Sequence, residues 1–123
     1  MLEQLKDWRG NLEKLIEQAE KVSAELELKD NTEISVRMVR DYIQRGILGD
    51  VDRFGRELEF SYPHLLKLVL SRVLLSDGWS LKKIGEHFEL TNTQDLEDLM
   101  PKQGNRALSA IKRLRSSVDG AAT

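Results

Sequence analysis

The chain has 123 residues, of which 33% are charged and 40% hydrophobic, a composition typical of one charged globular domain. It contains no cysteine, which excludes disulfides, thiolate zinc sites and cysteine nucleophiles. No run approaches the ~20 apolar residues of a membrane-spanning helix, and the first residues lack the apolar stretch of a signal peptide. We therefore expect a cytoplasmic protein that has no membrane partner. The net charge of −2 and the pI of about 5.7 argue against a uniformly basic nucleic-acid binder.

Residues 1–28 are predicted to form an N-terminal amphipathic helix. Its apolar residues recur at alternating spacings of three and four, namely Leu5, Trp8, Leu12, Leu15, Ala19, Val22 and Leu26. Gly10 indicates a local break near residues 9–11. This stripe either packs on the core of its own chain or forms a coiled coil with a second chain. Because three heptads are marginal for an autonomous coiled coil, the first alternative is favoured.

A short helix is predicted over residues 36–45, after a polar turn at residues 29–32. Ser35 is a suitable N-cap, and Gly46 suits the left-handed position that ends a helix. Beyond it, residues 47–60 have the pattern of a small β-hairpin. The expected strands are Ile47-Leu48 and Leu58-Glu59-Phe60, joined by a loop that contains Gly49 and Gly55.

The remaining residues predict further helices. The helix that begins near Pro63 and ends at Asp77-Gly78 is apolar nearly all round, which predicts the central core helix. Ser80 is expected to cap the next helix, and a short one should run from residues 91–93 to Pro101. A last helix is predicted over about residues 105–117, and residues 118–123 are expected to form a flexible tail.

Positive charge is concentrated in the middle of the chain. Between residues 34 and 56 the arginines outnumber the carboxylates, and they are Arg37, Arg40, Arg45, Arg53 and Arg56. A helix of about ten residues can enter the DNA major groove, which is ~12 Å wide. Arginines on the helix and on the following hairpin would then contact phosphates or base edges. The helix arginines, Arg45 included, are therefore candidate DNA contacts.

The same region resembles the MerR-type family of DNA-binding regulators. The segment Ile34-Ser35-Val36-Arg37-Met38-Val39-Arg40-Asp41-Tyr42-Ile43-Gln44-Arg45-Gly46-Ile47-Leu48 is similar to the recognition-helix signature of that family. Gly78-Trp79-Ser80-Leu81-Lys82-Lys83-Ile84 resembles the turn that opens the helix after the family's wing. Phe60-Ser61-Tyr62-Pro63-His64-Leu65 stands where the family leaves the wing. The resemblance covers about residues 11–90.

The resemblance implies a mainly α fold, a winged helix-turn-helix with a small β-hairpin wing plus N- and C-terminal amphipathic helices. One domain would span residues 1–123, with its core at 29–90 and C-terminal helices at 91–117. Dimerisation would come from the N-terminal heptads, the C-terminal helix, or both. The implied function is transcriptional regulation by a nucleoid-associated homodimer that binds double-stranded DNA. Helix 36–45 would read the major groove, and the wing at about 49–60 would meet the backbone or minor groove. Residues implied to contact DNA or support its binding are Ser35, Arg37, Arg40 and Tyr42 on the helix, with Arg53 and Arg56 on the wing.

The sequence departs from the family pattern at several places. Asp41 replaces a tyrosine and would repel phosphate unless it pairs with Arg37 or Arg45. Glu59 stands where the family often has a wing arginine. The link over residues 26–33 is longer than the family's tight turn, and no effector domain follows the short last helix. This leaves two alternatives, a minimal DNA-binding protein or part of a longer one.

No pattern of residues indicates catalysis. His64 and His87 are separated by 23 residues without a ligand-spaced partner, and no phosphate loop or nucleophile motif occurs. We therefore expect neither an enzyme nor a metal or cofactor site. Two further functions remain open, a protein-interaction module on a winged-helix scaffold that has lost DNA binding, and an architectural or partition factor. The acidic pI, Asp41 and Glu59 favour the module and its protein partner.

Overall fold

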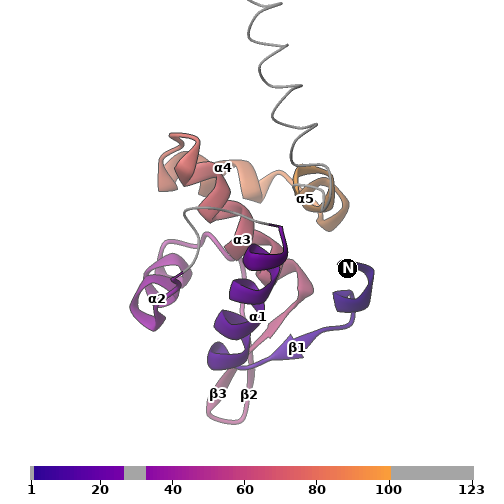
Figure 1. Ribbon diagram of the computed structural model, residues 1–123. Coiled ribbons are helices and arrows are strands. Elements are labelled where there is room, and N and C mark those ends of the chain that lie inside the picture. The colour runs from indigo at the N-terminus through magenta and orange to yellow at the C-terminus, as the bar shows by residue number, and fades with distance from the viewer. Residues whose placement is uncertain (1, 27–32, 101–123) are drawn as a thin grey trace, which may run out of the picture.

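The computed structural model describes residues 2–26 and 33–100, and this part of the chain is mainly helical with a small antiparallel sheet (Figure 1). In chain order the elements are the 3-10 helix η1 (Leu2–Leu5), β1 (Arg9–Gly10), α1 (Leu12–Glu25), α2 (Val36–Gln44), β2 (Asp52–Phe54), β3 (Glu57–Ser61), α3 (Tyr62–Ser76), α4 (Leu81–Glu89) and α5 (Thr93–Leu99). The predicted polar turn at 29–32, the last helix at 105–117 and the tail at 118–123 lie outside the described residues.

Helix α3 is the centre of the core, as its apolar sequence predicts. Helices α1, α4 and α5 all pack against it (Figure 1). Its buried side chains include Leu65, Leu66, Leu68, Val69 and Leu70. A helix that is apolar on nearly every side is stable only when neighbouring elements cover it on several sides. Helices α1, α4 and α5 provide this cover. The helix has Pro63 in its first turn and ends at Asp77, which is followed by Gly78 at φ +94°.

The prediction of one helix over residues 1–28 is wrong for its first third. Leu2–Leu5 form a 3-10 turn, Arg9–Gly10 form a strand, and α1 begins at Leu12. Asn11 caps α1 by accepting a hydrogen bond from the Lys14 backbone N–H at 3.0 Å. The predicted break at Gly10 is confirmed, and a Cβ there would lie 2.7 Å from the Lys14 Cβ and 2.9 Å from the Trp8 ring. The chain thus changes direction where only a residue without a side chain fits.

The second half of the predicted apolar stripe is covered within the chain. Leu15, Ala19, Val22 and Leu26 all belong to the buried core, and α1 contacts α3 and β3. This is the first of the two alternatives drawn from the sequence. The stripe residues of α1 that a coiled coil would use are therefore already buried.

Helix α2 agrees with its prediction to within one residue. The Ser35 Oγ accepts a hydrogen bond from the Met38 backbone N–H at 3.1 Å, which makes Ser35 the N-cap. Gly46 follows the helix at φ +76°, and the Ile47 N–H donates to the Tyr42 carbonyl at 3.0 Å. This bond, from the third residue past the helix end back to its last turn, is typical of a Schellman motif. It directs the chain into the core, where Ile47 and Leu48 are buried.

The sheet differs from its prediction at both ends. Ile47 and Leu48 are core residues rather than a strand, and the hairpin consists of β2 and β3 joined at Gly55-Arg56. Gly55 has φ +66°, which a tight hairpin turn favours. The strand order is β1-β3-β2, with Gly10 paired to Phe60 and Asp52 paired to Glu59. The first strand was not predicted, because two residues carry no periodicity.

Helices α4 and α5 begin where the sequence predicts. Ser80 caps α4 through a bond from the Lys83 N–H, and Asn92 caps α5 through a bond from the Asp95 N–H at 2.8 Å. Helix α5 is joined to the start of α3 by the Tyr62 hydroxyl, which donates to a Glu97 carboxylate oxygen at 2.8 Å. Burial, and next the hydrogen bond and the charge of Glu97, raise the pKa of Tyr62 above its usual value.

Tyr62 should therefore make the domain sensitive to alkali. Above pH ~10 the unfolded chain releases the tyrosine proton while the folded chain keeps it, so this contribution to stability is present below pH ~10 and lost as the pH rises. We expect the free energy of unfolding of the wild type to fall by up to about 1.4 kcal/mol per pH unit more steeply than that of Tyr62→Phe. Urea titrations between pH 9 and 11.5 measure the difference, and parallel curves would contradict it.

Candidate nucleic-acid interface

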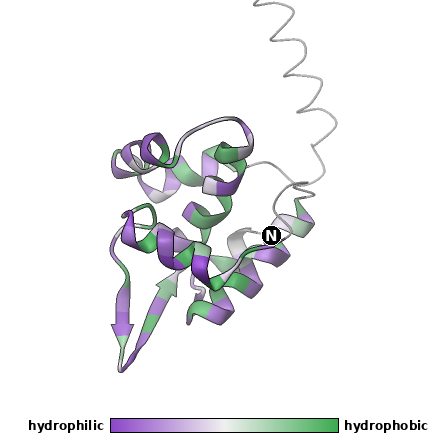
Figure 2. Ribbon diagram, turned by 90° about the vertical axis from the view of Figure 1, so that its left-hand side faces the viewer, coloured by the Kyte–Doolittle hydropathy of each residue, from purple (hydrophilic) through white to green (hydrophobic). Residues whose placement is uncertain are grey.

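An open groove of about 630 Å³ lies between helix α2 and the β2–β3 hairpin, beside the first turn of α1. In Figure 2 the hairpin projects away from the helices and carries mostly hydrophilic residues. The groove is lined by Asn11, Leu12 and Glu13 of the α1 start, by Val36, Arg40, Ile43 and Gln44 of α2, and by Arg53, Arg56, Glu57 and Leu58 of the hairpin. We call it the α2–hairpin groove.

Three of the arginines predicted from the sequence meet in this groove. Arg40 enters from α2, whereas Arg53 and Arg56 come from the hairpin. All three are exposed, and none takes part in an ion pair found within residues 2–26 and 33–100. Glu13 and Glu57 also line the groove, so cations outnumber carboxylates by one. Exposed guanidinium groups in a groove can donate to the oxygens of a polyanion.

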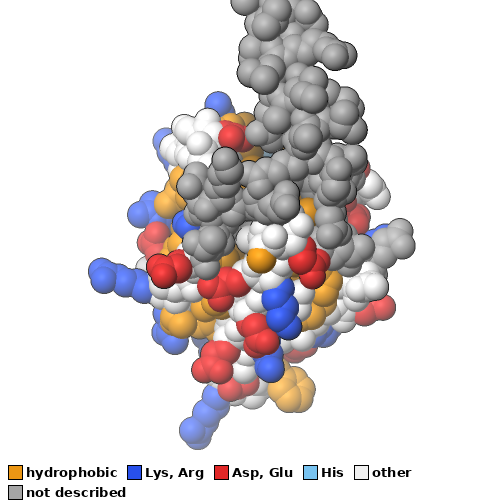
Figure 3. All heavy atoms as spheres, in the orientation of Figure 1, with side chains coloured by type: hydrophobic (Ala, Val, Ile, Leu, Met, Phe, Trp, Pro, Cys, Tyr) orange, Lys and Arg blue, Asp and Glu red, His pale blue; other side chains and the backbone are white. Residues whose placement is uncertain are grey.

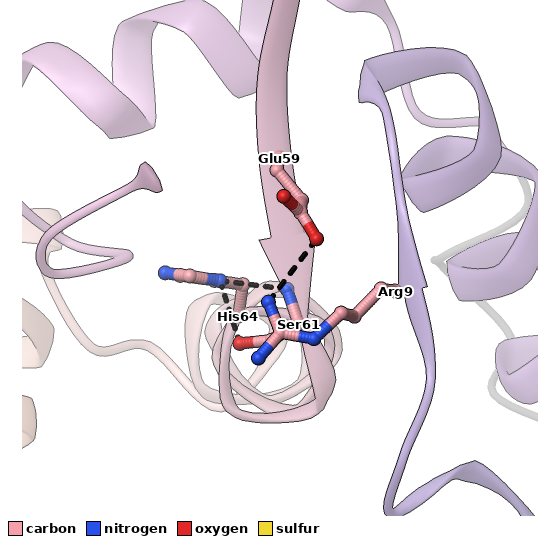
Figure 4. Close-up of polar contacts among 4 residues, drawn as sticks. All are labelled: Arg9, Glu59, Ser61 and His64. Carbon is pink, nitrogen blue, oxygen red and sulfur yellow. Dashed lines mark hydrogen bonds and ion pairs between the residues drawn. The ribbon is translucent and has the colours of Figure 1, made fainter. Parts of the chain in front are cut away.

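The base of the hairpin is fixed to the start of α3 by His64 (Figure 4). The ring Nδ1 accepts a hydrogen bond from the Ser61 backbone N–H at 2.9 Å, and Nε2 lies 2.6 Å from the Asp50 carbonyl oxygen. Because Nδ1 accepts, Nε2 carries the proton and donates to Asp50. The same ring meets Phe60 edge-on, with the centroids 5.7 Å apart. The His64 side chain thus links Asp50, in the segment that leads into β2, to Ser61 at the end of β3.

Lys67, one turn further along α3, contacts the same segment before β2. A Cβ placed on Gly49 would lie only 2.9 Å from the Lys67 Nζ, so the amine packs directly on the backbone there. Burial lowers the pKa of Lys67, and the nearby charge of Asp50 opposes this effect. Together with His64, this contact places the hairpin relative to α2.

Glu59, which departs from the family pattern, has a partner that the sequence did not indicate. Arg9 of β1 donates to a Glu59 carboxylate oxygen at 3.1 Å across the sheet (Figure 4). The two residues are 50 positions apart, so no local pattern could pair them. Glu59 is therefore partly neutralised and lies outside the α2–hairpin groove.

The other predicted contact residues differ in their surroundings. Arg37 is exposed on α2 but does not line the groove, and Ser35 is occupied as the N-cap. Tyr42 is only 3% exposed and belongs to the core, so a direct DNA contact at Tyr42 is wrong. Because Tyr42 packs on the inner face of α2, it can support DNA binding only by holding α2 against the core.

Arg45 and Asp41 form the ion pair that the sequence allowed. The Arg45 Nε donates to an Asp41 carboxylate oxygen at 2.9 Å, one helical turn apart. The pair removes the isolated negative charge from α2. It also makes Arg45 a weaker candidate than Arg40 for binding an anion, since its guanidinium already has a carboxylate partner.

Sequence reasoning missed several residues of the groove. Val36 and Gln44 share the α2 face with Arg40, and the start of α1 forms one end. The helical spacing could have placed Val36 and Gln44 beside Arg40. The contribution of α1 depends on long-range packing and had no local signal.

Figure 3 shows acidic and basic side chains interspersed over the face that carries α1. Within the described part of the chain no group of three or more His, Asp or Glu side chains could hold a metal ion. None of the helices described is both long and apolar enough to cross a membrane.

Comparison of the chain with protein-family models, with curated proteins and with solved structures gave no match. The fold and the groove define a mainly helical domain with a three-stranded antiparallel sheet and an arginine-lined groove.

Proposed function

We propose that the protein is a DNA-binding regulator of the MerR-like winged-helix kind, with α2 in the major groove and the β2–β3 hairpin as its wing. The observation that carries this proposal is the α2–hairpin groove, where Arg40, Arg53 and Arg56 meet without carboxylate partners among the described residues. One strand of the duplex would run through the groove, with its phosphates between the helix arginine and the wing arginines.

The dimensions of α2 agree with this arrangement. An α-helix with its side chains is about 10–12 Å in diameter, so α2 fits into a groove ~12 Å wide, and its nine residues extend for roughly 14 Å with the exposed face on the bases. Arg37 and Gln44 are both exposed and lie two turns apart on one side of α2, beside Arg40. Arginine can bond to guanine and glutamine to adenine in the major groove, so this face carries groups for sequence readout.

The biological unit that we propose is a homodimer. Two recognition helices in a dimer meet half-sites about one helical turn apart, and this spacing doubles the contacts made by one short helix. The sequence leaves open whether the N-terminal heptads, the C-terminal helices or both supply the dimer contact. The structure describes α1, whose stripe residues are buried in the core of the chain, and α5. As part of the same proposal, the protein regulates transcription and is located in the nucleoid.

The proposal is tested by binding of the full chain to random-sequence 20-bp duplex DNA, measured by fluorescence anisotropy between 50 and 300 mM salt. Each phosphate neutralised adds about 0.9 to the slope of log affinity against log salt, so at least three groove arginines predict a slope of about −2.7 or steeper. A Lys21→Ala variant, whose lysine pairs with Glu17 on α1, should bind like the wild type. No binding at 50 mM salt would refute the proposal.

The second candidate is a protein-interaction module, favoured by the exposed leucines at the ends of α4 and α5. Leu90 is 85% exposed and Leu99 is 46% exposed. A partner protein could cover each of them, and burial of a leucine side chain is favourable. The same salt series separates the two functions, because the module predicts no duplex binding by the wild type.

A further inference from the structure

One large aromatic side chain is left in solvent at the end of the hairpin. Phe54 is 79% exposed and takes no part in the hydrophobic core. It is the last residue of β2, directly before the Gly55-Arg56 turn. Burying a phenylalanine side chain is favourable, so this ring, 79% exposed at a projecting tip, would gain free energy from a partner that covers it.

The register of the hairpin shows which way this ring faces. Arg53 pairs with Leu58, and both residues line the α2–hairpin groove. Successive residues of a strand point to opposite faces, so Phe54 lies on the face turned away from that groove. The tip therefore presents arginines on one side and an aromatic ring on the other.

Two carboxylates lie beside Phe54. Glu57 is directly opposite Phe54 in the register and also lines the edge of the α2–hairpin groove, and Asp52 lies two residues before Phe54 on β2. Both would repel a phosphate, so the surroundings of the ring are unsuited to the sugar-phosphate backbone. An uncharged contact with the edges and faces of bases remains open to the ring.

We propose, resting on the DNA-binding function above, that Phe54 is an apolar wedge that enters the minor groove at the wing tip and partly unstacks one base step. Arg53 and Arg56 hold the adjacent strand while the ring inserts. Wedges of this kind kink the duplex, and pyrimidine–purine steps such as TA are the easiest to open. Phe54 would thereby favour DNA sites that have a pyrimidine–purine step under the wing. This preference would come from the ease of unstacking that step and not from a hydrogen bond to a base.

The test uses the full chain and a 20-bp duplex with one central TA step, labelled with 2-aminopurine at that step and with a donor and acceptor dye at the two ends. The wild type should raise the 2-aminopurine fluorescence and shorten the end-to-end distance. Phe54→Ala should lose both signals and bind about 10-fold more weakly. Its salt slope should not change, because no charge is removed. Leu90→Ala, which removes another exposed apolar side chain, should behave as the wild type.

Two further results distinguish this inference from the function on which it rests. Binding by the wild type with the expected salt slope, but without unstacking or bending, would overturn the wedge and leave the proposed function intact. The absence of duplex binding by the wild type would refute the proposed function itself. Glu57→Gln removes the carboxylate opposite the ring and should tighten binding several-fold, so weaker binding by this variant would also overturn the wedge.

Discussion

Replacement of Arg40, Arg53 and Arg56 by alanine is expected to weaken duplex DNA binding by a few hundred-fold at 0.1 M salt. Each arginine that neutralises a phosphate contributes about 0.9 to the salt slope, so the loss of three should reduce the slope by about 2.7 for each protomer bound. At 0.1 M salt, relative to 1 M, this change corresponds to roughly 500-fold in affinity. The three side chains are exposed around one groove, so the fold should persist. Anisotropy measures the affinity and circular dichroism the fold.

A matched variant separates the position of these charges from their number. Lys6, Lys21 and Lys82 are exposed and lie outside the α2–hairpin groove. Their joint replacement by alanine changes the net charge by the same amount, and we expect less than a threefold loss because exposed charges away from the contact are screened by salt. If both triple variants lose affinity equally, the groove is not the binding site.

Phe60→Ala is expected to lower the free energy of unfolding by about 3–5 kcal/mol. Phe60 is fully buried in β3, the strand that joins β1 to β2, and its ring contacts His64 edge-on. Its removal leaves a cavity where the hairpin meets α3. A domain of this size has a total stability of about 5–15 kcal/mol, so the variant retains only a small margin. Urea unfolding followed by circular dichroism gives the difference.

The control for this prediction is the same substitution six residues earlier. Phe54→Ala removes an equal number of atoms from the same hairpin, at a side chain that is 79% exposed instead of buried. Substitutions of this kind on a surface usually change stability by no more than about 0.5 kcal/mol. A loss from Phe60→Ala as small as that from Phe54→Ala would show that the hairpin contributes little packing to the domain.

The sequence predicted the elements that have strong local signals. Helix α2, with its Ser35 cap and its Gly46 end, and the apolar helix α3 appear where the residues indicate. The same holds for the Asp41–Arg45 pair, because residues four apart on a helix are neighbours. Local chemistry decided each of these features, so no knowledge of the tertiary structure was needed.

The features that the sequence did not predict all depend on distant partners. The helical pattern of residues 1–28 did not show that Arg9 and Gly10 pair with β3, because that pairing joins the start of the chain to its middle. Ile47 and Leu48 resemble a strand until the end of α2 directs them into the core. Arg40, Arg53 and Arg56 were each predicted as contacts, but the groove that unites them exists only once α1, α2 and the hairpin have packed.

The strand order β1-β3-β2 also bears on how the chain avoids pairing of its sheet edges with those of other chains. Strand β3 is the longest of the three and lies in the middle, while both outer strands are short and β2 carries charges at Asp52 and Arg53. Short, charged edge strands are poor templates for another chain. If the first ten residues were cut away, the backbone of β3 at Phe60 and Ser61 would lose its partner, and the unpaired edge would invite aggregation through intermolecular β-pairing.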